Sequence, residues 1–182
     1  ALCADFEEGA AGASPSLNHP IEGTTALTLG TWYHAAATYY GTTWKLYLNG
    51  NLEASMPILR PVASASTVAV ALGSALTSGN APAGFFNGTM DEVRIWNVAR
   101  DQAQIQSTAN IKLSAATPGL VARWNLDEGS GTVIGATAGT TTGGTITGPN
   151  YVWSTPGAPF NLAFNQQPAA PVLVAPANAA TG

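Results

Sequence analysis

The chain has 182 residues, enough for one domain of ordinary size, and 46% of them are hydrophobic, so a core can form. Only 9% are charged, with six Lys and Arg in all, and the formal net charge is −4. Nucleic-acid grooves and polybasic membrane surfaces need clustered basic residues, and spanning helices need long apolar runs, so neither partner is expected. The one cysteine, Cys3, excludes an internal disulfide, and its apolar neighbours predict a small buried side chain.

The pattern of apolar residues predicts an all-β protein. Short apolar runs bounded by Gly, Pro, Asn and Thr clusters are typical of a sandwich or barrel. The chain is expected to begin within a strand, 1–7, and to continue through a loop, 8–23. The segment 32–40 is rich in β-formers and apolar on both faces, which indicates an inner strand.

The segment 44–48 is the next expected strand. Its apolar residues share one face, and Lys45 and Tyr47 share the other. Asn49 and Gly50 follow, and this pair readily adopts the two positive φ angles of a tight hairpin turn. A third strand is therefore expected after the turn, and the three strands should form an antiparallel meander.

The remainder of the chain is predicted to add five strands and one short helix. The clearest strand is 89–98, whose alternation directs Val93 and Ile95 into the core. Glu92 and Arg94 then share the outer face, where a solvated ion pair is expected. The strands are expected at 67–72, 89–98, 120–126, 145–147 and 151–153, and the helix at 102–109.

The helix prediction depends on its first residues. Asp101 and Gln104 stand three residues apart in the pattern of a capping box, in which each side chain bonds the other's backbone N–H. Ile105 should be the inward anchor of this helix.

Composition changes at Pro156, after which prolines punctuate a stretch rich in Ala and Asn. Such a stretch is typical of an extended linker. We therefore expect one sandwich domain over 1–155 and a linker over 156–182, of which 171–182 has the apolar character of a strand that opens another β module.

Three segments together resemble laminin G-like jelly-roll domains. LGTWYHAAATYYGTTWKLYLNG (29–50) resembles their central hairpin, and GFFNGTMDEVRIWNVARDQAQIQ (84–106) resembles their last long strand with its short helix. GLVARWNLDEGSGT (119–132) is similar to their opening strand. The resemblance implies a concanavalin A-like fold: an all-β jelly-roll sandwich of two antiparallel sheets. The segment 171–182 more weakly resembles the start of a fibronectin type III-like module.

The order of these segments departs from the family pattern. The opening-type strand at Leu120 follows the closing-type strand, and we expect it to complete the same sandwich. The family also has several strands before its central hairpin, whereas here only 1–7 precedes the loop. The missing strands are expected from an upstream segment of the same polypeptide or, by strand addition, from a neighbouring subunit.

The resemblance also implies one structural calcium ion. Related domains often hold calcium near the end of the Asp-Glu-Val strand, and the matching residues are Asp91 and Asp127. Calcium takes six to eight oxygen ligands, and carboxylates are common among them. The alternative for Asp91 is a rim carboxylate that accepts hydrogen bonds from loop N–H groups.

Aromatic residues are the candidates for ligand binding, since Trp and Tyr stack on sugar rings as well as filling cores. Trp96 and Tyr47 lie opposite the apolar faces of their strands and are expected at the surface. Tyr39 and Tyr40, near a hairpin turn, are the next candidates.

Catalytic residues are not expected. Retaining glycosidases need two carboxylates about 5–5.5 Å apart, and the only pair on one expected strand face is Asp5 and Glu7, which lacks an accompanying carboxylate or aromatic platform. His34 lies in a core pattern and should be structural. His19 has no partner that the sequence reveals.

Three functions follow in order of preference. The first is a non-catalytic module of an extracellular, bacterial multi-domain protein, acting in adhesion or carbohydrate recognition at the cell surface. The second is a structural subunit of a surface layer or filament that assembles by strand complementation. The third is a β-sandwich glycoside hydrolase.

Overall fold

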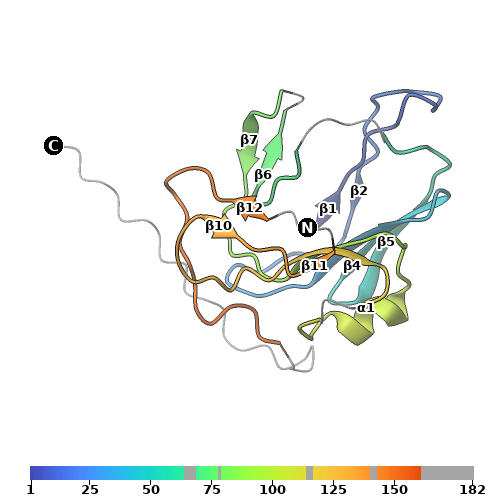
Figure 1. The fold of residues 1–182 in the computed structure, drawn as a ribbon. Coiled ribbons are helices and arrows are strands. Elements are labelled where there is room, and N and C mark those ends of the chain that lie inside the picture. Colours follow the sequence, from blue (N-terminus) through green and yellow to red (C-terminus); the bar gives the residue numbers. More distant parts are fainter. Residues whose placement is uncertain (64–68, 78, 114–116, 140–142, 161–182) are drawn as a thin grey trace. The chain divides into compact units, whose positions relative to one another are not determined.

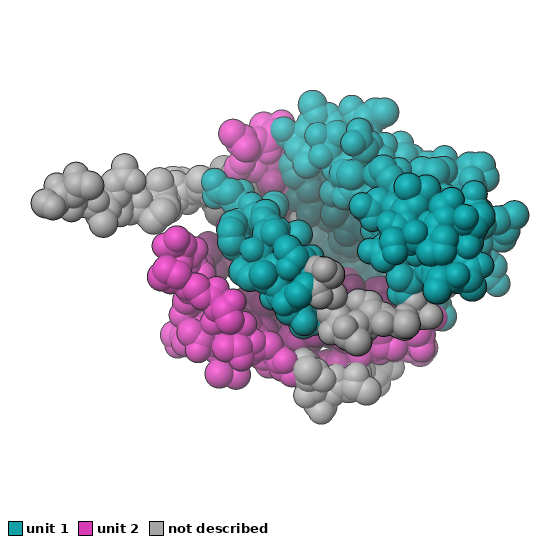
Figure 2. Space-filling view, turned by 90° about the horizontal axis from the view of Figure 1, so that it is seen from above, with its two compact units in different colours: residues 1–27, 33–87, 98–110 teal, residues 28–32, 88–97, 111–182 magenta. Residues whose placement is uncertain are grey.

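The computed structural model describes residues 1–63, 69–77, 79–113, 117–139 and 143–160 (Figure 1). These residues hold twelve strands, all paired antiparallel, and one helix, so the expected all-β class is confirmed. No helix in the described ranges has the length and apolar character needed to cross a membrane. The chain divides into two compact units (Figure 2). Unit 1 comprises 1–27, 33–87 and 98–110, and unit 2 comprises 28–32, 88–97 and 111–182.

The centre of unit 1 is the expected meander, formed by β3 (Ala35–Tyr39), β4 (Thr43–Leu48) and β5 (Asn51–Pro57). Asn49 has a φ of 49° and Gly50 a φ of 75°. These left-handed values are the ones that a two-residue hairpin turn requires. The turn therefore forms where the sequence predicts it, and it sets the register of β4 against β5.

The core of unit 1 lies on one face of this meander. Trp44 and Leu46 project from β4 and are buried together with Ile21. The rings of Phe6 and Tyr39 pack there as well, and Phe6 meets Trp44 edge to face at 5.4 Å between ring centroids. Aromatic packing of this kind adds about 0.5–1.5 kcal/mol beyond the apolar area that it buries.

Ile21 reaches this core from a strand that the sequence did not reveal. β2 (Ile21–Glu22) pairs with β1 (Cys3–Ala4), so the predicted loop 8–23 is wrong at its C-terminal end. β2 has only two residues, too few for the alternation of apolar and polar residues that identifies a strand in a sequence. The alternation along 1–7 places Leu2 and Ala4 inward, which leaves Cys3 exposed; the prediction of a buried cysteine is wrong.

The remaining strands of unit 1, β6 (Ser74–Leu76) and β7 (Pro82–Phe85), form a hairpin. The predicted strand 67–72 is wrong, because 69–72 is not extended in a ladder and 67–68 lies outside the described residues. β6 begins after Gly73, whose φ is 77°. The left-handed turn at this glycine therefore directly precedes the strand.

The helix of unit 1, α1 (Gln102–Thr108), begins as expected. Asp101 Oδ1 accepts from the Gln104 N–H at 2.8 Å, and Gln104 Oε1 accepts from the Asp101 N–H at 2.9 Å. Ile105 is the buried residue of the helix. The capping box and its apolar anchor are therefore confirmed.

Unit 2 contains the three-stranded sheet β11-β9-β8, made of β8 (Val93–Trp96), β9 (Leu120–Trp124) and β11 (Ala138–Gly139). The strand predicted at 89–98 starts only at Val93. Glu92 has a φ of 51°, a left-handed value that ends the extended backbone before β8.

Two smaller predictions for unit 2 had different outcomes. β10 (Val133–Ile134) pairs with β12 (Gly144–Thr145), so a short strand exists near the one predicted at 145–147. The segment 151–153 is not a strand; its Trp153 Nε1 donates to the Gly131 carbonyl at 3.0 Å. Residues 161–182, which include most of the predicted linker and the expected strand at 171–182, lie outside the described residues.

The buried cluster of unit 2 consists of Leu113, Leu120 and Ala138, and Trp96 packs against it. Trp96 shares its strand face with Arg94, so the inward face of β8 is the one that the sequence assigned to solvent. Ile95, expected in the core, is exposed. The predicted orientation of β8, with Val93 and Ile95 facing the core, was therefore wrong.

A buried carboxylate organises the N-terminal loop of unit 1. Glu8, only 1% exposed, accepts from the Ser14 N–H and from His19 Nε2, both at 2.8 Å, and Arg60 Nε lies 3.6 Å away. Gly12 lies so close to this carboxylate that a Cβ would not fit. The hydrogen bond from Ser14 leads the interactions that lower the pKa of Glu8 below its ordinary 4.5. His19 thus has the partner that the sequence could not show.

We predict that Glu8→Gln destabilises the chain at neutral pH and that the difference from wild type shrinks in acid. A carboxylate with a lowered pKa stabilises the fold above about 4.5, and this contribution is lost as pH falls through the folded-state pKa. Thermal melting between neutral pH and pH ~3 measures the difference in Tm. Glu7→Gln, an exposed neighbour, is the control. A gap between Glu8→Gln and wild type that stays constant across this range would contradict the prediction.

Candidate functional site

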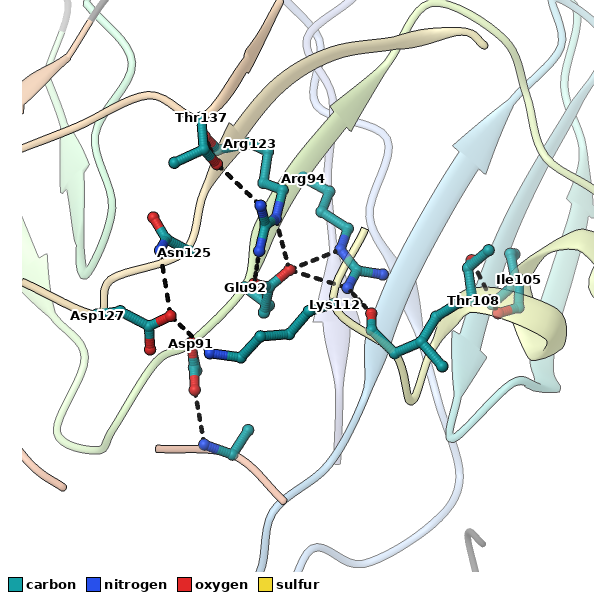
Figure 3. Close-up of polar contacts among 12 residues, drawn as sticks. Asp91, Glu92, Arg94, Ile105, Thr108, Lys112, Arg123, Asn125, Asp127 and Thr137 are labelled. Carbon is teal, nitrogen blue, oxygen red and sulfur yellow. Dashed lines mark hydrogen bonds and ion pairs between the residues drawn. The ribbon is translucent and has the colours of Figure 1, made fainter. Parts of the chain in front are cut away.

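The register of unit 2 places two arginines opposite each other. Arg94 of β8 pairs directly with Arg123 of β9. Like charges in directly opposed positions destabilise a sheet unless another charge lies between them. Glu92 supplies that charge, because the left-handed turn before β8 brings its carboxylate to the same place (Figure 3).

Glu92 bonds both guanidinium groups. Its Oε2 accepts from Arg94 Nη2 at 2.9 Å and from Arg123 Nε at 2.9 Å, and its Oε1 accepts from Arg123 Nη2. Arg123 Nη1 donates further to Thr137 Oγ1 at 3.1 Å, and Arg94 Nη2 to the Ile111 carbonyl. The bond from Glu92 raises the pKa of Arg123 above its ordinary value.

This Glu92 cluster (Glu92, Arg94 and Arg123) is buried. The three side chains are 4%, 8% and 10% exposed. The predicted ion pair between Glu92 and Arg94 exists, but the expectation that it is solvated is wrong. Arg123 was missed altogether; its only sequence signal is a charged residue inside the apolar run LVARWNL. Because its groups bond one another, the cluster is a structural cross-link and not a ligand site.

The two predicted calcium ligands, Asp91 and Asp127, lie close together beside the Glu92 cluster (Figure 3). Asp127 accepts from Lys112 Nζ at 2.5 Å and from Asn125 Nδ2 at 3.1 Å. Asp91 Oδ2 accepts from the Ala158 N–H at 2.6 Å. Burial, followed by the nearby charge of Asp127, raises the pKa of Asp91, whereas the bond from Lys112 lowers the pKa of Asp127.

This donor set does not fit a calcium ion. Calcium takes six to eight oxygens, and the described residues contain no group of three or more His, Cys, Asp and Glu side chains arranged for a metal. The cation beside the carboxylates is Lys112 itself, whose pKa is raised chiefly by its bond to Asp127. Asp91 Oδ1, however, is buried and accepts no hydrogen bond within the described part of the chain. The calcium ion that the family resemblance implies is therefore put to the test by the melting experiment below.

The four candidate aromatics have different environments. Tyr47 is only 2% exposed, so its predicted surface position is wrong. Trp96 packs against the apolar cluster of unit 2. Tyr39 is held by its ring contacts with Phe6 and Trp44, and its hydroxyl donates to the Gly41 carbonyl at 2.9 Å.

Tyr40 is the exception, because 79% of it is exposed. It lines a hollow of about 240 Å³ in unit 1, which we call the Tyr40 hollow. One wall is the face of β3 and β4 that points away from the core, and the other is the segment that leads into α1. The lining residues are Thr38, Tyr40, Thr42, Thr43, Lys45, Tyr47, Ala99, Arg100 and Asp101.

The residues considered for catalysis do not assemble. Asp5 and Glu7 are both exposed. His19 is committed to Glu8. The backbone N–H of His34 donates to Asn49 Oδ1 at 2.9 Å beside the hairpin turn, in line with the structural role expected for that region.

Residues 7–106, more than half of the chain, match the Concanavalin A-like lectin/glucanases superfamily, which confirms the resemblance found in the sequence. Pappalysin-1 of Mus musculus is 34% identical over 105 residues, 54% of this chain and 6% of pappalysin-1. The segment 171–182, for which the sequence weakly predicts a fibronectin type III-like module, lies outside the matched residues.

Two solved structures are also similar. A candidate carbohydrate-binding protein from Bacteroides ovatus has a TM-score of 0.56 and 24% identity, over 78% of this chain and 47% of that one. An S-layer domain-containing protein from Clostridium thermocellum has a TM-score of 0.39 and 25% identity, over 50% and 45% of the two chains. The first likeness shows the fold alone, and the second is too weak to carry an argument. This chain spans less than half the length of each relative.

We predict that Glu92→Gln is strongly destabilising, because it leaves two buried guanidinium groups without a carboxylate. Removing one partner of a buried ion pair costs about 3–5 kcal/mol. Urea unfolding followed by tryptophan fluorescence measures the change. Glu22→Gln, an exposed position on β2, is the control.

A second variant separates charge from packing at the same place. The triple replacement Glu92→Met, Arg94→Leu and Arg123→Met removes all three charges, and it should be more stable than Glu92→Gln because no charge remains buried and unpaired. A Glu92→Gln chain as stable as wild type would show that the cluster is not the cross-link described here.

We also predict that the melting temperature is the same with calcium and with chelator, because the Lys112 ammonium already lies against Asp127. An ion that bound only the folded chain would raise stability by about 2.7 kcal/mol at a hundredfold excess over its Kd. Differential scanning calorimetry in the two conditions tests this. A higher Tm in calcium would show that the ion displaces Lys112 and would support the calcium site expected from the sequence.

Proposed function

Because the chain belongs to the Concanavalin A-like lectin/glucanases superfamily, we propose that it is a non-catalytic carbohydrate-binding module. The superfamily name covers both binding proteins and glucanases, so the choice between them depends on the residues of this chain. The observation that carries the proposal is the Tyr40 hollow, where an exposed aromatic ring stands beside threonine hydroxyls.

The hollow has the groups that sugar recognition uses. A tyrosine presents an apolar ring face with a polar end, and Tyr40 keeps that face open to solvent. Thr38, Thr42 and Thr43 each carry a hydroxyl that both donates and accepts hydrogen bonds. The hollow therefore offers a few polar groups that converge beside an exposed aromatic ring.

Catalysis is disfavoured by the state of the carboxylates. Glycosidases need an accessible acid and an accessible nucleophile or base. Asp91 has one oxygen buried and the other bonded to the Ala158 N–H, and Asp127 is paired with Lys112. Glu8 and Glu92 are buried in ion pairs. These four side chains are engaged within the fold rather than presented to a substrate, and the exposed pair Asp5 and Glu7 lacks the accompanying groups of a glycosidase site.

The proposed setting is the cell surface or the extracellular space, with adhesion as the consequence of glycan binding. Few charges and many neutral polar residues suit a surface that must approach another surface without strong repulsion. The fold is shared with a candidate carbohydrate-binding protein of B. ovatus, so the proposed function is one that this fold is able to host. Upstream strands or a neighbouring subunit remain proposed partners.

We predict that the full 182-residue chain binds a subset of glycans on an array and does not hydrolyse them. Incubation with the bound glycans, followed by a reducing-end assay, should detect no new ends. Tyr40→Ala should lose binding but keep the wild-type Tm, because its ring is exposed. Release of reducing ends would favour the glycosidase. Absence of any bound glycan, together with self-association on sizing, would favour the structural subunit.

A further inference from the structure

The Tyr40 hollow has a wall whose composition is set by the register of the meander. Lys45 pairs with Thr38 across β3 and β4, and Trp44 pairs with Tyr39. Because Trp44 belongs to the core, its neighbour Lys45 must point to the opposite face. The hollow therefore lies on the face of β3 and β4 that is opposite to the face packed into the core of unit 1.

Two of the six basic residues of this acidic chain line the hollow, Lys45 and Arg100. Lys45 is half-buried, and no carboxylate of the described residues forms an ion pair with it. Arg100 Nη1 bonds Thr108 Oγ1 at 2.5 Å, which anchors the guanidinium beside α1. The site is thus positively charged on a chain whose net charge is −4.

The one acidic residue that lines the hollow, Asp101, caps the helix α1 with its carboxylate. Asp101 Oδ1 accepts from the Gln104 N–H in the capping box. The Asp101 carboxylate is therefore fixed at the start of α1 by this hydrogen bond. With Lys45 and Arg100 positive and Asp101 negative, the charged residues that line the hollow carry a net charge of +1.

The shape of the hollow limits what can enter. Its volume of about 240 Å³ lies below the roughly 300–1,000 Å³ of pockets that enclose drug-sized ligands. One sugar ring with its substituent suits this space, while the rest of a polysaccharide would continue over the exposed Tyr40 ring. Tyr47, which is buried, forms part of the floor.

We propose that the Tyr40 hollow binds an anionic sugar residue of a polysaccharide, with Lys45 and Arg100 bonding its carboxylate or sulfate and Tyr40 stacking on a ring. This proposal rests on the carbohydrate-binding function proposed above and names its ligand class. Charge-assisted hydrogen bonds to an anion are roughly twice as strong as neutral ones. A neutral glycan would desolvate the Lys45 ammonium without supplying an anion to it, so the hollow discriminates by charge.

The test is calorimetric titration of the full chain with matched probes. Oligogalacturonate and its methyl ester share a backbone, but only the first carries charged carboxylates; dextran sulfate and dextran share a backbone, but only the first carries sulfates. Binding is expected for at least one charged member and for neither neutral one, with affinity that falls as salt is added. Whichever acidic probe binds identifies the group. Equal binding of a charged probe and its neutral partner would overturn the proposal.

Variants locate the binding. Lys45→Gln and Arg100→Gln should each lower the affinity for the acidic probe by about tenfold, which is the scale expected when one charge-assisted hydrogen bond is lost. Arg60→Gln removes the same charge from unit 1 outside the hollow and should bind as wild type. Melting curves of all variants check that they fold. Wild-type affinity in both Lys45→Gln and Arg100→Gln would overturn the proposal.

Two outcomes separate this proposal from the proposed function. Neutral glycans bound on the array, unaffected by Lys45→Gln, would leave carbohydrate binding in place and remove the anionic hollow. Poly-glutamate bound as tightly as oligogalacturonate would show attraction to any polyanion, and it would overturn sugar recognition at the hollow as well.

Discussion

The bonds that Glu92 makes to Arg94 and Arg123 are the constraint on which the sheet of unit 2 depends. The ladder of β8 and β9 brings the two arginines face to face, and burial removes the water that would otherwise screen them. Only a carboxylate between them makes this register acceptable. The same residue has a φ of 51°, so the backbone turn that ends the preceding segment also delivers the charge. A shift of one residue in this register would put Arg94 and Arg123 on opposite faces of the sheet and separate Arg123 from Glu92.

Unit 1 uses a buried carboxylate in a similar way, but to hold a loop. Glu8 is closed off from water by Ser14, His19 and Arg60, and residues 9–20 around it include no buried hydrophobic side chain. Four of the six basic residues of the chain are in ion pairs with acidic ones. In a chain with so few charges, most therefore act within the fold. Lys45, which forms no such pair among the described residues, stands out for that reason.

Local signals in the sequence predicted local structure well. The Asn49-Gly50 turn, the alternation of β4 and the capping box at Asp101 each depend on neighbours within a few residues, and all three are present. Contacts between distant segments were not predictable in the same way. Which face of β8 points inward depends on the bond between Glu92 and Arg123, which are thirty-one positions apart in the chain. An alternation pattern cannot show that two charged residues will share a buried partner.

The candidate site was partly predictable for the same reason. Tyr40 follows a recognisable strand and its exposure agrees with its place at a turn, whereas Tyr47 sits deep in the outer face of β4 and is buried. Arg100 joins the hollow only because α1 folds back along unit 1, where Gln106 lies against Gly50. The apolar face of the meander is constrained by Trp44 and Leu46, so changes there would cost stability. Its other face carries Lys45 and Thr38 with no such constraint, and a fold of this class can alter its ligand by changing that face while its core stays the same.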